Sequence, residues 1–209
     1  IVLDDAVKIE DFSKFKKKSK NNKRKKFVYT GSFVNGKGVE IIIRLANIFK
    51  NHDFILYGNI DTMSLDNYNK CNFTKNVSLN EYTDYNKIPL ILSNADYLLM
   101  PYEKKIGVLI SNLNVSKYIS PLKMFEYLAA KKIIFATKQP SYNHILKDNF
   151  NSIILELNDL QNWKKRITDV INNPLKYKML KINAFNTAKK YTWKNRCLII
   201  ENFFNECKK

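Results

Sequence analysis

Short apolar runs alternate along the chain with longer segments in which hydrophobic positions recur at helical spacing. The first run, "KFVYTGSF" (26–33), has the composition of a strand buried on both faces of a parallel sheet. The next segment, 36–52, spaces its apolar residues three or four positions apart, which predicts an amphipathic helix. Further strands are predicted at 53–59, 76–83, 96–102, 132–137 and 151–157, and further helices at 84–95, 121–131, 141–148, 160–173, 175–190 and 192–209.

This alternation predicts the fold class. Strands that alternate with helices are typical of a parallel sheet covered on both faces, so we expect a doubly wound, Rossmann-like α/β domain with additional C-terminal helices. Ligands of such sheets bind at the carboxyl ends of the strands. Three segments are therefore expected to lie together: residues 30–38, residues 57–59, and the start of the 121–131 helix.

The composition narrows the class of protein. The 209 residues are 45% hydrophobic and 13% aromatic, which indicates a globular protein with a substantial core. No apolar run is long enough to span a bilayer. The three cysteines and two histidines lack metal-ligand spacing, so no metal site is predicted. An odd number of cysteines suits the reducing cytoplasm, which is the expected location.

The net charge of +17 comes largely from one segment, residues 14–26, which holds nine basic residues and no acidic one. Three interpretations are open: a solvated linker, a contact with anionic lipid at the inner face of a membrane, and a nucleic-acid site. Nucleic acid fits least, because only Phe15 offers a ring on which bases could stack. We therefore predict no nucleic-acid partner and keep peripheral membrane contact, through the stretch from Lys14 to Lys26, as the alternative to a solvated tail.

The glycine-rich turn "GSFVNGKG", which begins at Gly31, is the first candidate for ligand binding. Glycine allows the backbone to approach a phosphate closely, and the following helix supplies free N–H groups. Lys37 lies at the start of that helix, where the helix dipole disfavours a cation unless an anion neutralises it. The spacing matches neither a P-loop nor a dinucleotide-binding motif. An anion site and a plain structural turn both remain open at this point.

The stretch "SPLKMFEYLAAKK", which begins at Ser120, is the second candidate. Ser120 is expected to cap the helix and Pro121 to fit its first turn. The free amides near Leu122 and Lys123 would then face the carboxyl edge of the sheet, where a diphosphate could accept hydrogen bonds. Glu126 lies about one turn further, and its carboxylate could accept both hydrogens of a vicinal diol such as a ribose. The alternative is an amphipathic helix on which Lys123 and Glu126 form a solvated pair.

Six motifs follow one another along the chain: "VYTGSFVNGKGVEIIIRLA", "FILYGN", "NVSLNEYT", "ADYLLMPY", "SPLKMFEYLAAKKIIFAT" and "YTWKNRCLIIENFF". This order resembles the C-terminal half of family 4 (group 1) glycosyltransferases, and the resemblance covers nearly the whole chain. It implies a GT-B fold, in which two Rossmann-like domains enclose the active site and the C-terminal domain binds the nucleotide-sugar donor. Residues 1–25 would be the interdomain linker with the basic segment, 26–190 the donor-binding domain and 191–209 a C-terminal helix, with the N-terminal acceptor domain absent.

The resemblance also implies roles for single residues. Glu126 matches the second glutamate of the family's E-x7-E motif, which holds the donor ribose. Lys37 matches the lysine of the family's phosphate-binding Arg/Lys pair, and the amides of Leu122 and Lys123 match those that meet the diphosphate.

Two positions depart from the family pattern. Ser32 stands at the arginine position and Tyr118 at the first glutamate, and we expect Lys123 to offset the missing arginine. The expected donor-binding residues are Gly31, Ser32, Lys37, Tyr118, Ser120, Pro121, Leu122, Lys123 and Glu126.

The resemblance implies a retaining transferase, of the hexosyltransferase type, that uses a UDP- or GDP-sugar. The acceptor would be a cell-envelope polysaccharide, a lipid or another glycan. No cofactor or metal is expected, because lysines and helix amides can bear the diphosphate charge. Catalytic residues are expected mainly in the N-terminal domain, so none is assigned, and the chain alone should bind the donor without turnover. The alternative function is a non-catalytic α/β module that binds nucleotide or an anionic surface through its basic segment.

Overall fold

The structure is a computed structural model that describes residues 1–15, 23–59, 61, 73–107 and 114–207. Most of the predicted basic segment, residues 16–22, lies outside the described residues, as does Cys71. None of the described helices is long and apolar enough to cross a membrane.

Six parallel strands form one sheet in the order β3-β2-β1-β4-β5-β6, which confirms the predicted doubly wound fold. The order reverses between β1 and β4, because β2 and β3 follow β1 on one side and β5 and β6 follow β4 on the other. Such a reversal opens a crevice at the carboxyl edge of the sheet, where ligands bind. The strands are β1 (Lys26–Thr30), β2 (Asp53–Tyr57), β3 (Val77–Asn80), β4 (Tyr97–Met100), β5 (Ile133–Thr137) and β6 (Ile153–Leu155).

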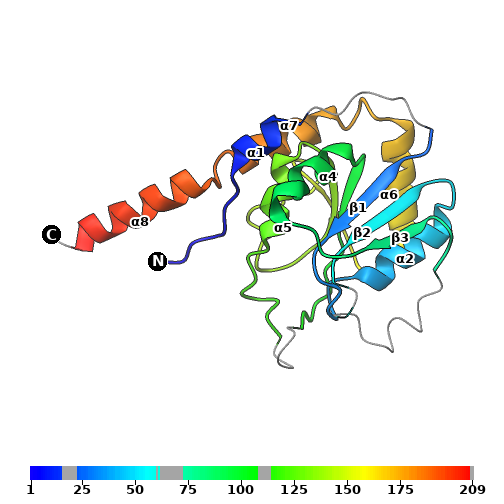
Figure 1. The fold of residues 1–209 in the computed structure, drawn as a ribbon, viewed down its shortest axis with the longest axis horizontal. Helices are drawn as coiled ribbons and strands as arrows, with labels where there is room; N and C mark the ends of the chain where they lie inside the picture. The colour runs from blue at the N-terminus through cyan, green and yellow to red at the C-terminus, as the bar shows by residue number, and fades with distance from the viewer. Residues whose placement is uncertain (16–22, 60, 62–72, 108–113, 208–209) are drawn as a thin grey trace.

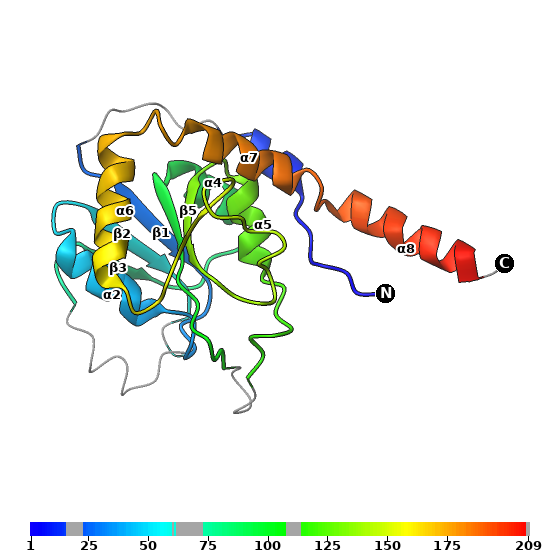
Figure 2. The same ribbon diagram turned by 180° about the vertical axis from the view of Figure 1, so that it is seen from behind.

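Helices cover both faces of the sheet (Figures 1 and 2). On one face, side chains of α2 and α6 pack on the sheet around Phe27, whose ring is stacked on that of Phe54 at 4.7 Å. On the other face, α1, α4 and α5 pack around Leu98 and Phe125, both fully buried. The helices are α1 (Ile9–Ser13), α2 (Val39–Ile48), α4 (Ile88–Asn94), α5 (Leu122–Ala129), α6 (Leu160–Asn172), α7 (Lys178–Ala188) and α8 (Trp193–Cys207).

The segment that precedes the basic stretch packs against the body of the domain. Val7 is fully buried and forms a parallel bridge with Thr192, just before α8. Asp5 forms an ion pair with Arg196 at 2.6 Å. α8 itself extends away from the body beside the N-terminus and has no buried residue within its described length (Figure 1).

The short helix predicted at 141–148 is wrong, because this segment forms turns. The Asn151 side chain accepts a hydrogen bond from the Lys147 N–H at 2.8 Å and donates one to the Ile145 carbonyl at 2.9 Å. A buried asparagine therefore uses backbone groups that a helix would otherwise pair, which is how such side chains compete with regular structure.

Candidate functional site

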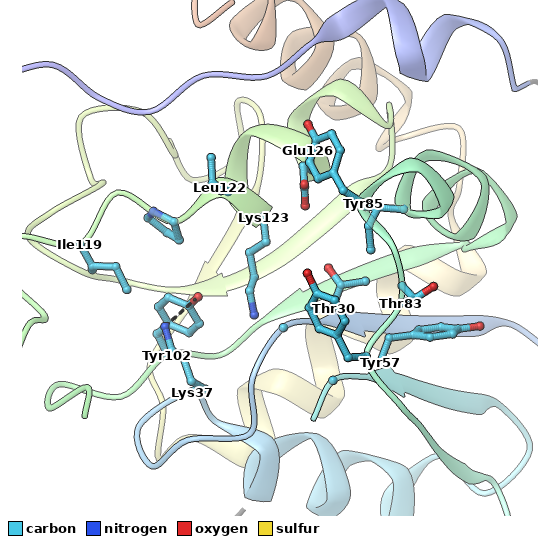
Figure 3. A pocket seen from close by; sticks show the side chains of 15 residues that line it. Thr30, Lys37, Tyr57, Thr83, Tyr85, Tyr102, Ile119, Leu122, Lys123 and Glu126 are labelled. Carbon is cyan, nitrogen blue, oxygen red and sulfur yellow. Dashed lines mark hydrogen bonds between the residues drawn. The ribbon is translucent and has the colours of Figure 1, made fainter. Parts of the chain in front are cut away.

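A pocket of about 320 Å³ lies at the carboxyl edge of the sheet, where the strand order reverses. Each of the first four strands is followed by residues that line it, and the start of α5 closes one side (Figure 3). The predicted meeting of three separate segments at this edge is confirmed. The lining residues are Thr30, Gly31, Lys37, Tyr57, Gly58, Tyr82, Thr83, Tyr85, Ile88, Tyr102, Ile119, Pro121, Leu122, Lys123 and Glu126.

The first turn of α5 differs from the prediction in its cap. Pro121, in an extended conformation, is the N-cap, and no side chain caps the helix. The prediction that Ser120 caps α5 is wrong, because its hydroxyl accepts a hydrogen bond from the Asp5 N–H at 2.8 Å. The start of α5 therefore reaches the pocket without a side-chain cap, and the partial positive charge of a helix N-terminus favours an anion there.

Lys123 is the most unusual side chain of the pocket. Only 9% of the residue is exposed, and its Nζ has no hydrogen-bond partner among the described residues. The ammonium lies 3.7 Å from the centroid of the Tyr29 ring. Burial, and then repulsion by Lys37, hold the pKa of Lys123 well below its usual range. A buried ammonium without a hydrogen-bond acceptor is costly, so the position is better explained by an anionic ligand than by stability.

Glu126 is also buried, with 7% exposed, and points into the pocket on the side of Tyr85 (Figure 3). Burial raises the pKa of its carboxyl group to about 7, an effect that Lys123 partly opposes. Among the described residues the carboxylate of Glu126 has no ion pair within 4.0 Å, Lys123 included. The interpretation of Lys123 and Glu126 as a solvated surface pair is therefore wrong.

Lys37 reaches the pocket from the glycine-rich turn. Its Nζ donates to the Tyr102 hydroxyl at 3.5 Å, and burial lowers its pKa to about 8. The glycines beside it have a structural role: Gly38 has φ +78°, and a Cβ there would lie 1.8 Å from the Pro101 carbonyl oxygen. The glycines therefore have the structural role of the turn, Lys37 faces the pocket, and the anion site stays a prediction.

The structure brings six of the nine expected site residues to the pocket: Gly31, Lys37, Pro121, Leu122, Lys123 and Glu126. Three expected residues are not among those that line it. The Ser32 carbonyl accepts a hydrogen bond from the Tyr29 hydroxyl at 2.7 Å. Tyr118 is 85% exposed, and Ser120 holds the N-terminal segment as described above.

Four tyrosines of the pocket were not among the expected donor-binding residues: Tyr82, Tyr85, Tyr102 and Tyr57, which lies in the predicted segment 57–59. Tyr57 ends β2, Tyr82 and Tyr85 lie between β3 and α4, and Tyr102 follows β4. The rule that ligands meet the carboxyl ends of strands could therefore have found them. An aromatic residue at the end of a strand is also typical of a hydrophobic core, so the sequence alone did not single out these tyrosines as ligand-binding residues.

Comparisons with known proteins identify the family and support the fold. The chain matches the family model of the glycosyl transferases group 1 over residues 10–187. An uncharacterized glycosyltransferase of Methanocaldococcus jannaschii is 22% identical over 180 residues, which are 86% of this chain and 47% of the relative. The chain thus spans about half the length of the relative it matches.

Solved structures share the fold. Sucrose-phosphate synthase from Thermosynechococcus elongatus has a TM-score of 0.73 at 13% identity, over 88% of this chain and 46% of that one. HepE from Anabaena, solved with UDP and glucose, has a TM-score of 0.67 at 15% identity, over 93% and 52%. The C-terminal domain of LpcC, a glycosyl transferase group 1 family protein from Francisella tularensis, has a TM-score of 0.61 at 16% identity, over 90% and 96%. The chain therefore belongs to the glycosyl transferases group 1, and its sheet is the Rossmann-like C-terminal half of a GT-B fold.

Proposed function

We propose that the pocket binds the nucleotide diphosphate of a sugar donor and that the chain is the donor-binding half of a retaining glycosyltransferase. The observation that carries this proposal is the buried Nζ of Lys123, which lacks a hydrogen-bond partner among the described residues and lines the same pocket as Lys37 and the start of α5. Two ammonium groups and a helix N-terminus that face one cavity call for an anion of high charge density.

The diphosphate would lie between the two lysines and the first turn of α5. Each hydrogen bond between a charged phosphate oxygen and these donors contributes roughly 1.5–3 kcal/mol. In the complex, a phosphate oxygen would accept a hydrogen bond from the ammonium of Lys123, which has no hydrogen-bond partner among the described residues.

Glu126 would hold the ribose. Its carboxylate faces the same pocket and is an acceptor that can take both hydroxyl hydrogens of a vicinal diol. Structural neighbours support a nucleotide here: HepE from Anabaena was solved with UDP-glucose, and TarM from S. aureus was solved with UDP. Tyr57, Tyr82 and Tyr85 line the same pocket, with Tyr85 beside Glu126 (Figure 3), and would contact the nucleoside.

The finer points of the activity are part of the same proposal. We infer hexosyl transfer with retention of configuration, from a UDP- or GDP-sugar to an envelope polysaccharide, a lipid or another glycan. Lysines and helix amides would bear the diphosphate charge without a metal ion. Because the chain spans about half of its relative, the acceptor site and the catalytic residues are expected in the other half of a GT-B enzyme.

Calorimetric titration tests donor binding directly. UDP, GDP and UDP-glucose are titrated, with a chelator present, into the wild-type chain, into Glu126→Ala and into Glu201→Ala, a matched control on the exposed face of α8. We expect saturable binding of at least one nucleotide, at least tenfold weaker for Glu126→Ala and unchanged for Glu201→Ala. Failure of all nucleotides to bind rejects the donor site. Equal binding by Glu126→Ala rejects its ribose role, and binding that requires added Mg²⁺ rejects the metal-free arrangement.

The basic stretch from Lys14 to Lys26 would hold the enzyme at an anionic membrane face. The supporting observation is its nine basic residues without an acidic one. Replacement of Lys16, Lys17, Lys18 and Lys20 by glutamine leaves β1 intact and removes four of these charges. Cosedimentation with vesicles of anionic lipid should then fall severalfold, whereas unchanged cosedimentation rejects the contact.

A further inference from the structure

Two ammonium groups share one aromatic ring in the pocket. The Nζ of Lys37 lies 4.6 Å from the centroid of the Tyr102 ring, and the Nζ of Lys123 lies 5.3 Å from it. The lysines come from different elements, one from the turn before α2 and the other from α5, and both side chains converge on Tyr102 (Figure 3). Lys37 is also tied to the Tyr102 hydroxyl by a hydrogen bond of 3.5 Å.

The pair has no counter-charge within the described part of the chain. Neither lysine forms an ion pair with a described carboxylate within 4.0 Å. The carboxyl group of Glu126 raises the pKa of Lys123, but by less than the repulsion from Lys37 lowers it. Attraction to the ring faces of Tyr29 and Tyr102 compensates part of the repulsion between the two cations. An anion with charge on two adjacent groups would compensate the rest.

The ring that carries the pair is firmly held. Tyr102 is 1% exposed and packs edge-on against Tyr142 at 6.3 Å. Its carbonyl accepts hydrogen bonds from the Thr137 hydroxyl and, at 3.1 Å, from the Gln139 side chain. Tyr102 is therefore fixed to the end of β5 and to the segment that follows, and it can set the positions of flexible lysine side chains.

Gly31 gives Lys123 the room to reach this ring. A Cβ at Gly31 would lie 2.4 Å from the Nζ of Lys123, closer than any real contact, and the centroid of the Tyr29 ring lies 3.7 Å from the same Nζ. The ammonium of Lys123 is thus confined by Gly31, Tyr29 and Tyr102.

We propose that Tyr102 is a positioning residue that holds Lys37 and Lys123 as a clamp, and that this clamp selects a diphosphate over a monophosphate. The inference rests on the proposed donor site, which it deepens by naming the group that sets phosphate selectivity. A diphosphate offers one charged group to each ammonium, whereas a monophosphate leaves one of them without a partner.

The test compares pyrophosphate with orthophosphate, and UDP with UMP, by calorimetric titration. The proteins are the wild-type chain, Tyr102→Phe and Tyr102→Leu, with Tyr97→Phe and Tyr97→Leu as controls at a buried tyrosine of β4 outside the pocket. Tyr102→Leu removes the ring from both lysines and should weaken pyrophosphate and UDP about tenfold. Tyr102→Phe keeps the ring, loses only the hydroxyl contact of Lys37, and should weaken them about threefold. Orthophosphate and UMP should change less than twofold in both.

The ratio of the affinity for a diphosphate to the affinity for a monophosphate separates a positioning role of Tyr102 from a merely structural role. The clamp is overturned if the Tyr102 variants lose diphosphates and monophosphates equally, or if the Tyr97 variants lower the ratio as much. If Tyr102→Leu does not fold, Tyr102→Phe alone decides, because it keeps the packing. If selectivity for pyrophosphate depends on Tyr102 but UDP binds no more tightly than pyrophosphate, the clamp is supported and the nucleotide is rejected. If UDP binds but no preference for pyrophosphate depends on Tyr102, the clamp is rejected and the nucleotide is supported.

Discussion

Replacing Glu126 by glutamine should remove a pH-dependent cost to folding. The carboxyl group is buried without an ion pair among the described residues, and burial raises its pKa from 4.5 to about 7. Between these two pH values the unfolded chain loses the proton of Glu126 while the folded chain keeps it. The free energy of unfolding therefore falls as pH rises from 4.5 to 7, and this group adds no further pH dependence below or above that interval.

The magnitude follows from the same interval. Each pH unit between the two pKa values corresponds to about 1.4 kcal/mol, so Glu126 costs about 3 kcal/mol of stability at pH 7 and above. Lys37 and Lys123, whose pKa values are lowered, have the opposite sign, because stability regained by a buried lysine increases as pH rises. They are present in both proteins, so the difference between wild type and Glu126→Gln reports the carboxyl group together with its smaller coupling to Lys123.

Urea denaturation followed by circular dichroism measures this difference at half-unit steps from pH 4.5 to 8, in buffers free of phosphate. The variant should gain up to about 3 kcal/mol on the wild type across the interval and then keep a constant advantage. Parallel stability curves for the two proteins would refute the claim that Glu126 is buried with a raised pKa.

Three further predictions concern the turn, the core and the charge of the pocket. Gly38→Ala should destabilise the chain by at least about 2 kcal/mol in urea denaturation, because φ of Gly38 is +78° and the new Cβ would meet Pro101. As the control, Gly107→Ala should change the stability little, because the atom nearest to its Cβ would lie 3.5 Å away. Asn76→Ala should lower the free energy of unfolding by about 2–3 kcal/mol in the same assay, because the buried amide of Asn76 donates hydrogen bonds to the carbonyls of Ala46, Phe49 and His52. As the control, Asn94→Ala at an exposed position should change it by less than about 0.5 kcal/mol. UDP affinity should fall threefold to tenfold between about pH 7 and 9, because Lys37, with a pKa of about 8, loses its charge. This fall should be smaller in Lys37→Met, and an equal fall in both proteins would assign the effect to another group.

The sheet and α5 were predictable because their signals are local. Each strand is a short apolar run, and the structure trims the predicted strands mainly at ends where the chain leaves the sheet toward the pocket, as at Gly31 and Gly58. α5 was predicted at 121–131 and spans Leu122–Ala129. Periodicity specifies such elements without reference to distant residues.

The roles of side chains needed contacts that a local pattern does not contain. Spacing alone left Lys123 and Glu126 on a solvated face, because it does not say which elements cover a helix. Serine is a residue type that often caps helices, but the Ser120 hydroxyl accepts a hydrogen bond from the N–H of Asp5, which is distant in sequence. The helix predicted at 141–148 failed for the same reason, because the buried Asn151 competes for its backbone groups.

The departure at Ser32 has a structural counterpart. Where the family resemblance implies an arginine, this chain places a serine whose side chain does not line the pocket. The second cation of the pocket is Lys123 of α5, whose Nζ lies close to Gly31, the residue before Ser32. The expectation that Lys123 offsets the arginine is therefore compatible with the geometry and stays a prediction.

A crystal structure of the chain with UDP tests the central claim most directly. The account predicts the diphosphate between Lys37 and Lys123 at the first turn of α5, with both ribose hydroxyls on the carboxylate of Glu126. Ordered UDP at any other surface, or in this pocket with its ribose turned away from Glu126, would contradict it.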